Sequence, residues 1–216
     1  MGLATGDERD GARERLLEAA ARHFAEHGFE GASQRAIQRD AAVNSAAAHY
    51  YFGSKETLYQ EVIKTHLSGI LAERQRRMEA IPEGTLGHDR LKALVSAYIG
   101  PHMELALSHA GRPYGRILAR VLSEPTNSAN SIFDETISPL RQRFIAELHG
   151  ILPDASPVTI SKIVSMTVLL MAVVPYNSTW SALTGEDQAQ HGSDDWVEAV
   201  QTFACAGIEA ICRNSN

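Results

Sequence analysis

The amino-acid sequence predicts an all-α protein of about nine helices, and three observations lead to this fold class. Apolar residues recur with a period near 3.6 in almost every segment of the 216 residues. No segment shows the sustained alternation of apolar and polar residues that marks a half-buried strand. The hydrophobic content of 44% is high enough for a substantial core. We therefore expect a globular helical protein.

Residues with strong capping preferences divide the N-terminal part of the chain into four helices. Gly28 suits the left-handed end of the first helix, and Gly53 suits the end of the third. Ser33, Asn44 and Ser54 can each accept a hydrogen bond from a free N–H group at the start of the helix that follows. The expected helices cover residues 11–27, 34–41, 45–51 and 55–80.

The rest of the chain is divided by short breaks rich in Gly, Pro, Asn and Asp. The five helices expected there cover residues 88–108, 113–123, 128–151, 157–183 and 194–213. The domains expected from this organisation are a disordered tail over residues 1–10, a helix-turn-helix DNA-binding domain over 11–55, and a ligand-binding and dimerisation domain over 56–216.

Composition argues against several classes of protein. The net charge of -6 is unsuited to coating nucleic acid through bulk electrostatics. The longest apolar stretch, residues 163–174, is shorter than the roughly 20 residues that a bilayer requires, so no membrane span is expected. The first ten residues have neither a basic start nor an apolar core, which indicates a cytoplasmic protein without a signal peptide.

Enzymatic and metal sites also lack support in the sequence. It contains no P-loop, no GxGxxG after a strand, no GxSxG and no metal-spaced Cys/His set, so we expect no cofactor and no enzymatic activity. His23 and His27 are four residues apart on one helix, but they lack a third ligand and are better explained as a solvated face. Arg112, Arg116 and Arg120 share a face that could hold a carboxylate ligand, although a salt-bridged surface explains them more simply.

The segment VNSAAAHYYFGSK, residues 43–55, predicts a short helix with small residues at its start and rings at its end. Another short helix lies before this one in the chain, and a turn of three or four residues joins the two. This is the pattern of a helix-turn-helix. Arg35, Arg39 and Lys55 make this part of the chain locally positive. Base edges lie at the floor of the major groove, where Asn44 and the small residues after it would let the backbone approach.

The aromatic end of this helix suits the wall of the groove. His49, Tyr50 and Tyr51 carry polar atoms that can hydrogen-bond phosphates while parts of their rings pack on the first helix. Phe52 is expected to be buried. Lys55 would oppose the helix macrodipole unless an anion lies between its ammonium and the free N–H groups, and we expect that anion to be a DNA phosphate.

The stretch from Arg13 to Val62 resembles the DNA-binding domain of TetR/AcrR-type transcriptional regulators, most specifically in AAARHFAEHGFEG, AAV and YYFGSKETLY. The DNA-contacting residues expected from the residues and the resemblance together are Ser33, Gln34, Arg35, Asn44, Ser45, Ala46, Ala47, His49, Tyr50, Tyr51 and Lys55. The resemblance implies that Arg35 reaches a base and that Ser45 and Ala46 face bases. Ala47, His49 and Tyr51 depart from the family pattern, which usually has Thr, Tyr and His at these positions.

The C-terminal part resembles the CecR-like subgroup of this family over PYGRILARVLSEPTNSANSIFDETISPLRQRFIAELHGIL. The family implies a homodimer built on the last two long helices. The residues expected at that interface are Val168, Met171, Trp196, Val200, Phe203, Ala204, Gly207 and Ile211. Their apolar stripes agree with a two-fold interface, and the alternative is the ordinary core of a monomer.

The function expected from the resemblance is repression at a palindromic DNA operator, released when a small-molecule effector binds. Residues expected to line the effector site are Met78, Tyr98, His102, Met103, Tyr114, Ile117, Leu118, Phe133, Met171 and Tyr176. Rings and Met side chains with a few polar tips are typical of such sites. The same set describes any helical core, and each residue alone is better explained by core packing than by ligand contact. The alternative function is a helical small-molecule-binding protein that has lost DNA binding.

Overall fold

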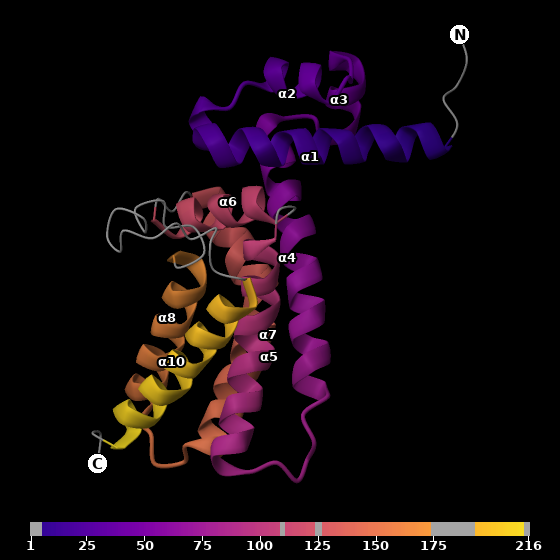
Figure 1. Ribbon diagram of the computed structural model, residues 1–216. Coiled ribbons are helices and arrows are strands. Elements are labelled where there is room, and N and C mark those ends of the chain that lie inside the picture. The colour runs from indigo at the N-terminus through magenta and orange to yellow at the C-terminus, as the bar shows by residue number, and fades with distance from the viewer. Residues whose placement is uncertain (1–5, 109–110, 124–126, 174–192, 214–216) are drawn as a thin grey trace. The chain divides into compact units, whose positions relative to one another are not determined.

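The computed structural model describes residues 6–108, 111–123, 127–173 and 193–213, and all regular structure within these ranges is helical. The helices are α1 (Gly6–Gly31), α2 (Gln34–Asp40), α3 (Ser45–Phe52), α4 (Lys55–Glu79), α5 (Gly87–Leu107), α6 (Arg112–Ser123), α7 (Asn127–Ile151), α8 (Pro157–Val173) and α10 (Ser193–Arg213) (Figure 1). The all-α fold class predicted from the sequence is confirmed for the described residues.

The chain divides into two compact units. The first contains residues 1–67 and 113–134, and the second contains residues 68–112 and 135–216. Helix α4 belongs to the first unit up to Leu67 and to the second unit beyond it. Packing therefore groups α6 and the first half of α4 with the N-terminal helices, whereas the sequence analysis grouped them with the C-terminal ones.

Two details of α1 differ from the predicted helix. It begins at Gly6, inside the segment predicted to be a tail, rather than near residue 11. It also continues beyond Gly28 for one more turn, to Gly31, after a sharp kink. Gly28 makes the kink with a φ of 70° and a ψ of 179°, in a region that residues with a Cβ rarely enter. Gly28 was predicted to end the first helix; it kinks the helix instead, and helical structure resumes as far as Gly31.

The three predicted capping side chains of the N-terminal helices all make their hydrogen bonds. Asn44 Oδ1 accepts from the backbone N–H of Ala47 at 2.8 Å, and Ser54 Oγ accepts from that of Thr57 at 3.0 Å. Ser33 Oγ accepts a longer bond of 3.4 Å from the third residue after it. Each bond satisfies a donor that the helix itself leaves without a partner, so α2, α3 and α4 begin where the sequence predicts.

Aromatic side chains form much of the core of the first unit. The ring of Phe24 on α1 meets that of Tyr59 on α4 edge to face, with 4.9 Å between the centroids. Phe52, at the end of α3, is buried as predicted, and the guanidinium of Arg13 lies 5.5 Å from its ring centroid. These contacts hold α3 and α4 to α1, so the short helices do not depend on their own weak helical stability.

Helices α5, α7, α8 and α10 pack together as the core of the second unit (Figure 1). Tyr98 of α5 and Phe144 of α7 stack at its centre with ring centroids 3.9 Å apart, and both side chains are fully buried. Across the ranges that the structure describes, no helix is both long enough and apolar enough to cross a bilayer. The same ranges hold no cluster of three side chains suited to a metal ion.

Candidate nucleic-acid interface

Helices α2 and α3 pack beside each other on α1, and the predicted DNA-contacting residues lie along them (Figure 1). Most of these side chains are exposed, and only Ala47, Tyr51 and Lys55 are half-buried. The exposed ones are Ser33, Gln34, Arg35, Asn44, Ser45, Ala46, His49 and Tyr50. The starts of both helices therefore present a surface of small and polar side chains to which a large partner has access.

The opposite side of α2 is fixed to the first unit. Ile37 is fully buried, and the side chain of Arg15 on α1 donates to the Ala41 carbonyl at 3.2 Å. His23 Nε2 lies 2.7 Å from a carboxylate oxygen of Asp40, and this hydrogen bond lowers the pKa of Asp40. Ala42 makes the turn to α3 with a φ of 52°, a conformation that favours glycine. Anchoring of this kind holds the exposed face in one orientation.

The rings at the end of α3 differ in burial, and only the burial of Phe52 confirms a prediction. Phe52 faces the core, whereas Tyr50 is 78% exposed and contacts the ring of Tyr51 edge to face at 5.4 Å. His49 Nδ1 lies 2.8 Å from the carbonyl oxygen of Gly53, so this nitrogen carries a proton and donates to the turn. The other ring nitrogen can then donate to a phosphate only when the imidazole is protonated.

Lys55 has two partners within the first unit that the sequence did not reveal. Its ammonium donates to the Glu30 carbonyl at 3.1 Å and lies 4.9 Å from the centroid of the Phe29 ring. The last carbonyls of a helix lack intrahelical partners, which makes the end of α1 a natural acceptor for a cation. Lys55 therefore has a structural contact besides the predicted phosphate contact, and its remaining donors are left for that phosphate.

The residues predicted for the dimer interface point in more than one direction. Phe203 on α10 is 68% exposed, and Gly207 has open space where a Cβ would stand. Met171, Val200 and Ala204 are instead buried within their own unit. Three more predicted interface residues, Val168, Trp196 and Ile211, are half-buried. On α8, the large apolar side chains that face outward are Val158, Met166 and Leu169, which the sequence analysis did not name.

The residues predicted for the effector site fall in both units. Tyr114, Ile117 and Leu118 lie in the first unit, where the Tyr114 ring stacks on His66 at 4.3 Å between centroids. Met78, Tyr98, His102, Met103 and Met171 are buried in the second unit. His102 Nε2 lies 3.1 Å from the Met171 carbonyl and joins α5 to α8. Tyr176 and the side chain of Phe133 lie outside the described residues.

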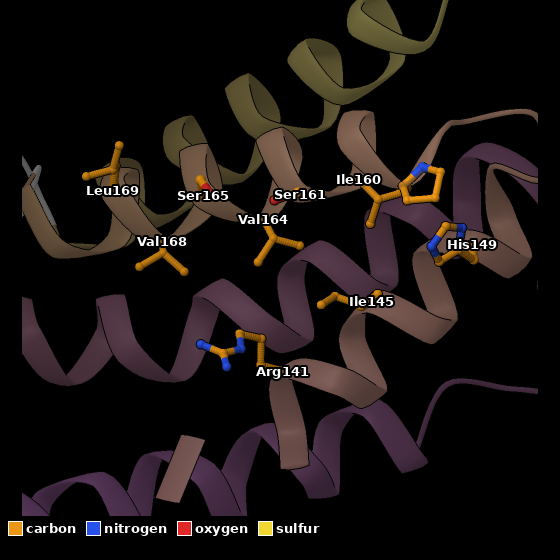
Figure 2. Close-up of a pocket in the computed structure, with 10 residues that line it drawn as sticks. Arg141, Ile145, His149, Ile160, Ser161, Val164, Ser165, Val168 and Leu169 are labelled. Carbon is orange, nitrogen blue, oxygen red and sulfur yellow. The ribbon is translucent and has the colours of Figure 1, made fainter. Parts of the chain in front are cut away.

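A groove of about 590 Å³ lies between α7 and α8 in the second unit (Figure 2). Val164 and Val168 point into it from α8, and Arg141, Ile145 and His149 line it from α7. It contains none of the residues predicted for the effector site, and Val168 is its one predicted dimer residue.

Arg74 is a buried residue that the predictions from the sequence did not include. This arginine of α4 is only 5% exposed and lies in the interior of the second unit. A signal was available, because Arg74 occupies a position of the apolar stripe formed by Leu67, Ile70 and Met78. An arginine in such a stripe is unusual, since charged side chains are rarely buried without a partner.

The histidine pair of α1 and the arginines of α6 were the two other polar clusters noted in the sequence, and their described side chains lie at or near the surface of the first unit. His23 pairs with Asp40, and His27 lies 3.8 Å from a carboxylate oxygen of Glu26. Arg116 is exposed, and Arg120 donates to the Glu26 carbonyl at 3.3 Å. The side chain of Arg112 is not among those described.

Two protein families match this chain. Residues 16–62 match the family described as bacterial regulatory proteins, tetR family, and residues 96–207 match the family described as Tetracyclin repressor-like, C-terminal domain. The second match covers just over half of the 216 residues. The chain belongs to the TetR family of bacterial regulatory proteins. The family predicted from the sequence is thereby confirmed, whereas the CecR-like subgroup stays a prediction.

Curated relatives match 27% to 38% of the chain. The HTH-type transcriptional repressor AcnR of Corynebacterium efficiens is 42% identical over 59 residues, which is 27% of this chain and 31% of that protein. The HTH-type transcriptional regulator BetI of Agrobacterium fabrum is 34% identical over 83 residues, 38% of this chain and 39% of that protein. The chain thus covers well under half the length of these relatives.

Solved structures match nearly the whole chain at low identity. The fatty acid degradation regulator FadR from Bacillus halodurans superposes with a TM-score of 0.68 at 14% identity, covering 94% of this chain and 97% of that one. A putative transcriptional regulator from Pseudomonas aeruginosa PAO1 gives a TM-score of 0.66 at 15% identity, covering 98% and 95%. At this level of identity the likeness shows a shared fold alone.

Proposed function

We propose that this protein is a cytoplasmic, homodimeric repressor that binds an inverted-repeat operator through α2 and α3. One observation carries the proposal most strongly. Asn44, Ser45 and Ala46 are exposed at the start of a helix whose far end is anchored by buried Phe52. Small exposed side chains at the start of such a helix allow close approach to base edges. The family and the name of the relative AcnR support repression as the mode of action.

Arg35 and Lys55 have different roles in this proposal. Arg35 is exposed in the first turn of α2, from which its guanidinium can reach a base edge. Lys55 contacts a phosphate while its ammonium keeps the Glu30 carbonyl, which fixes the side chain in place before DNA arrives. Arg35 contributes sequence preference, and Lys55 contributes affinity for DNA of any sequence.

The proposed dimer interface uses the outward faces of α8 and α10. Phe203, Met166 and Leu169 are large, apolar and exposed, which is costly in water unless a second copy covers them. Gly207 leaves open space beside Phe203 on α10 and permits close approach of a partner helix. A self-complementary surface of this kind suits a two-fold dimer. The two α3 helices of such a dimer, which we call the reading helices, would lie about 34 to 36 Å apart on B-DNA.

We propose that the effector binds in the second unit, among the predicted residues Met78, Tyr98 and His102. Helix α4 begins at Lys55 beside the DNA-contacting residues and ends at Glu79, one residue beyond Met78. A ligand that tilts its far end changes the spacing of the two reading helices, and so weakens operator affinity by about 1 to 3 kcal/mol.

The decisive experiment is a gel-shift assay with the DNA that flanks the gene encoding this protein. Retardation that follows an inverted repeat within that DNA supports the repressor. Absence of binding to this DNA and to scrambled duplexes alike, by a folded dimer, contradicts it and leaves the protein that binds only small molecules. An effector would then be recognised by its ability to dissociate the retarded complex.

A further inference from the structure

The guanidinium of Arg74 is a buried cation without a described anion beside it. Its Nη2 lies 3.1 Å from Met171 Sδ, and its Cζ lies 4.5 Å from the centroid of the Tyr98 ring. Nε is buried and makes no hydrogen bond. Among the described residues, no carboxylate forms an ion pair with it. A thioether sulfur is only a weak acceptor, so the polar groups of this side chain are poorly satisfied.

The described residues near Arg74 do not supply the missing negative charge. Burial raises the pKa of the Tyr98 phenol, and the positive charges of Arg74 and Arg141 oppose that rise without removing it. The phenol therefore stays protonated near neutral pH. Its ring offers Arg74 a cation–π contact, which offsets part of the cost of burial but uses none of the five N–H donors.

The next arginines on α4 show that acidic side chains are available in this part of the unit. Arg77 pairs with Glu73 at 2.7 Å and with Glu104 at 2.6 Å, and Arg76 also pairs with Glu73. The hydrogen bonds from Arg76 and Arg77 lower the pKa of Glu73 to about 2. Arg76 is largely exposed and would tolerate having no partner, since water can solvate it. Among the described residues, the accessible Arg76 and Arg77 thus have carboxylate partners, whereas the enclosed Arg74 has none.

We propose that Arg74 binds the carboxylate group of an acidic effector in the interior of the second unit. Met171 Sδ occupies the position of a carboxylate oxygen when the ligand is absent. Methionine has three rotatable bonds and a polarisable sulfur, so it can move aside at low cost. The planar guanidinium can then form two parallel hydrogen bonds to the acid, and Nε gains an acceptor. His102 and Tyr98 stand next to Met171 and Arg74 and complete the polar side of the site.

The apolar part of the ligand follows from the same surroundings. Met78, Met103 and Met171 are buried in the same core and give it flexible apolar walls. A compact aliphatic or aromatic monocarboxylate has both features that this environment requires. The proposal deepens the regulatory function proposed above and rests on it only for the consequence at the operator.

Thermal unfolding of the full chain with matched ligands tests the proposal. The probes are octanoate, decanoate, benzoate and phenylacetate, each compared with its primary amide. We expect at least one acid, and not its amide, to raise the unfolding temperature of the parent protein. R74M should weaken binding of that acid on the order of a hundredfold, because the buried charge pair is lost. R77M removes a partly exposed and paired arginine from the same helix, and this variant should bind the acid as the parent does.

Two results would overturn the proposal: no acid stabilising the parent more than its amide does, or R74M retaining the full response. Without ligand, R74M should unfold at a temperature equal to or above that of the parent, because an unpaired buried charge has been replaced by an apolar side chain. If R74M does not fold, R74K keeps the charge but loses the planar fork, and unchanged acid binding by R74K contradicts the site. Acid binding without any operator binding would instead contradict the proposed function and leave this site intact.

Discussion

The helix-turn-helix surface and the interior of the second unit place their arginines in opposite environments. Arg35 is exposed at the start of α2, where water solvates it until a partner arrives. Arg74 is enclosed by Tyr98 and Met171, and its Nε has no hydrogen-bond partner. Leaving an exposed cation unpaired costs little, whereas leaving a buried one unpaired costs much more. The first arrangement suits a large external partner, and the second suits a small molecule that enters the protein.

The largest effect is expected at the proposed dimer surface on α8 and α10. Phe203→Glu places a charge in a dry interface and should convert the dimer to monomer, with loss of specific operator binding. Light scattering at micromolar concentration measures the change. Thr202→Glu adds the same charge one position away, beside a groove toward α5, and should leave the dimer intact. A parent protein that is itself a monomer at this concentration contradicts the proposed interface.

His66 extends the comparison to a buried titratable group of the first unit. Burial lowers its pKa from 6.5 to about 4, so the folded protein keeps the ring neutral above that pH. Between these two values the unfolded chain takes up a proton that the folded chain does not. The contribution of the neutral His66 ring to the free energy of unfolding is therefore fully present above pH 6.5. It is lost as the pH falls toward 4, by up to about 3 kcal/mol.

Urea unfolding of the parent and of His66→Phe at pH 7 and pH 5 measures this loss. The phenyl ring can still stack on Tyr114 but does not titrate, so the variant should lose less stability on acidification than the parent. His27→Gln, which removes a more exposed histidine of the same unit, should behave like the parent. Equal acid sensitivity in all three proteins would show that His66 is solvated in the folded state.

Arg35 and Lys55 test the exposed side of the comparison. Arg35→Ala should cost about 1 to 3 kcal/mol of operator binding and relax the preference at one base pair per half-site. Lys55→Ala should weaken binding to all sequences alike and reduce the salt slope by about one per subunit. As a control, Arg116→Ala removes an exposed arginine of α6, and it should change neither the sequence preference nor the salt slope. Binding like the parent in both test variants would make the helix-turn-helix assignment wrong.

The smallest effect concerns the turn that orients the reading helix. Ala42 is exposed and has a φ of 52°, so its Cβ contributes strain and little packing. Ala42→Gly should stabilise the protein by about 0.5 to 1 kcal/mol, measured as a rise of the thermal midpoint of about 1 to 4 °C. Ala46→Gly changes an exposed helical position and should instead lower the thermal midpoint. A fall in the midpoint of Ala42→Gly would show that the turn is not strained.

Local features of this protein were determined by its sequence. The hydrogen bonds of Ser33, Asn44 and Ser54, which begin three helices, each join residues three positions apart. The left-handed glycine after α3 likewise acts within one turn of the chain. Because these interactions lie within a few residues, the sequence alone predicted where α2, α3 and α4 begin.

Tertiary packing decided what no local pattern contains. Phe203 and Val200 belong to one apolar stripe of α10, but only Phe203 faces outward, because the helices of the same unit cover the other side. The Glu30 carbonyl that holds Lys55 is 25 residues away in the chain, and Met171 lies 97 residues from Arg74. A periodic pattern shows that a helix has a buried side, but its neighbours determine which residues that side contains and which of its polar groups find partners.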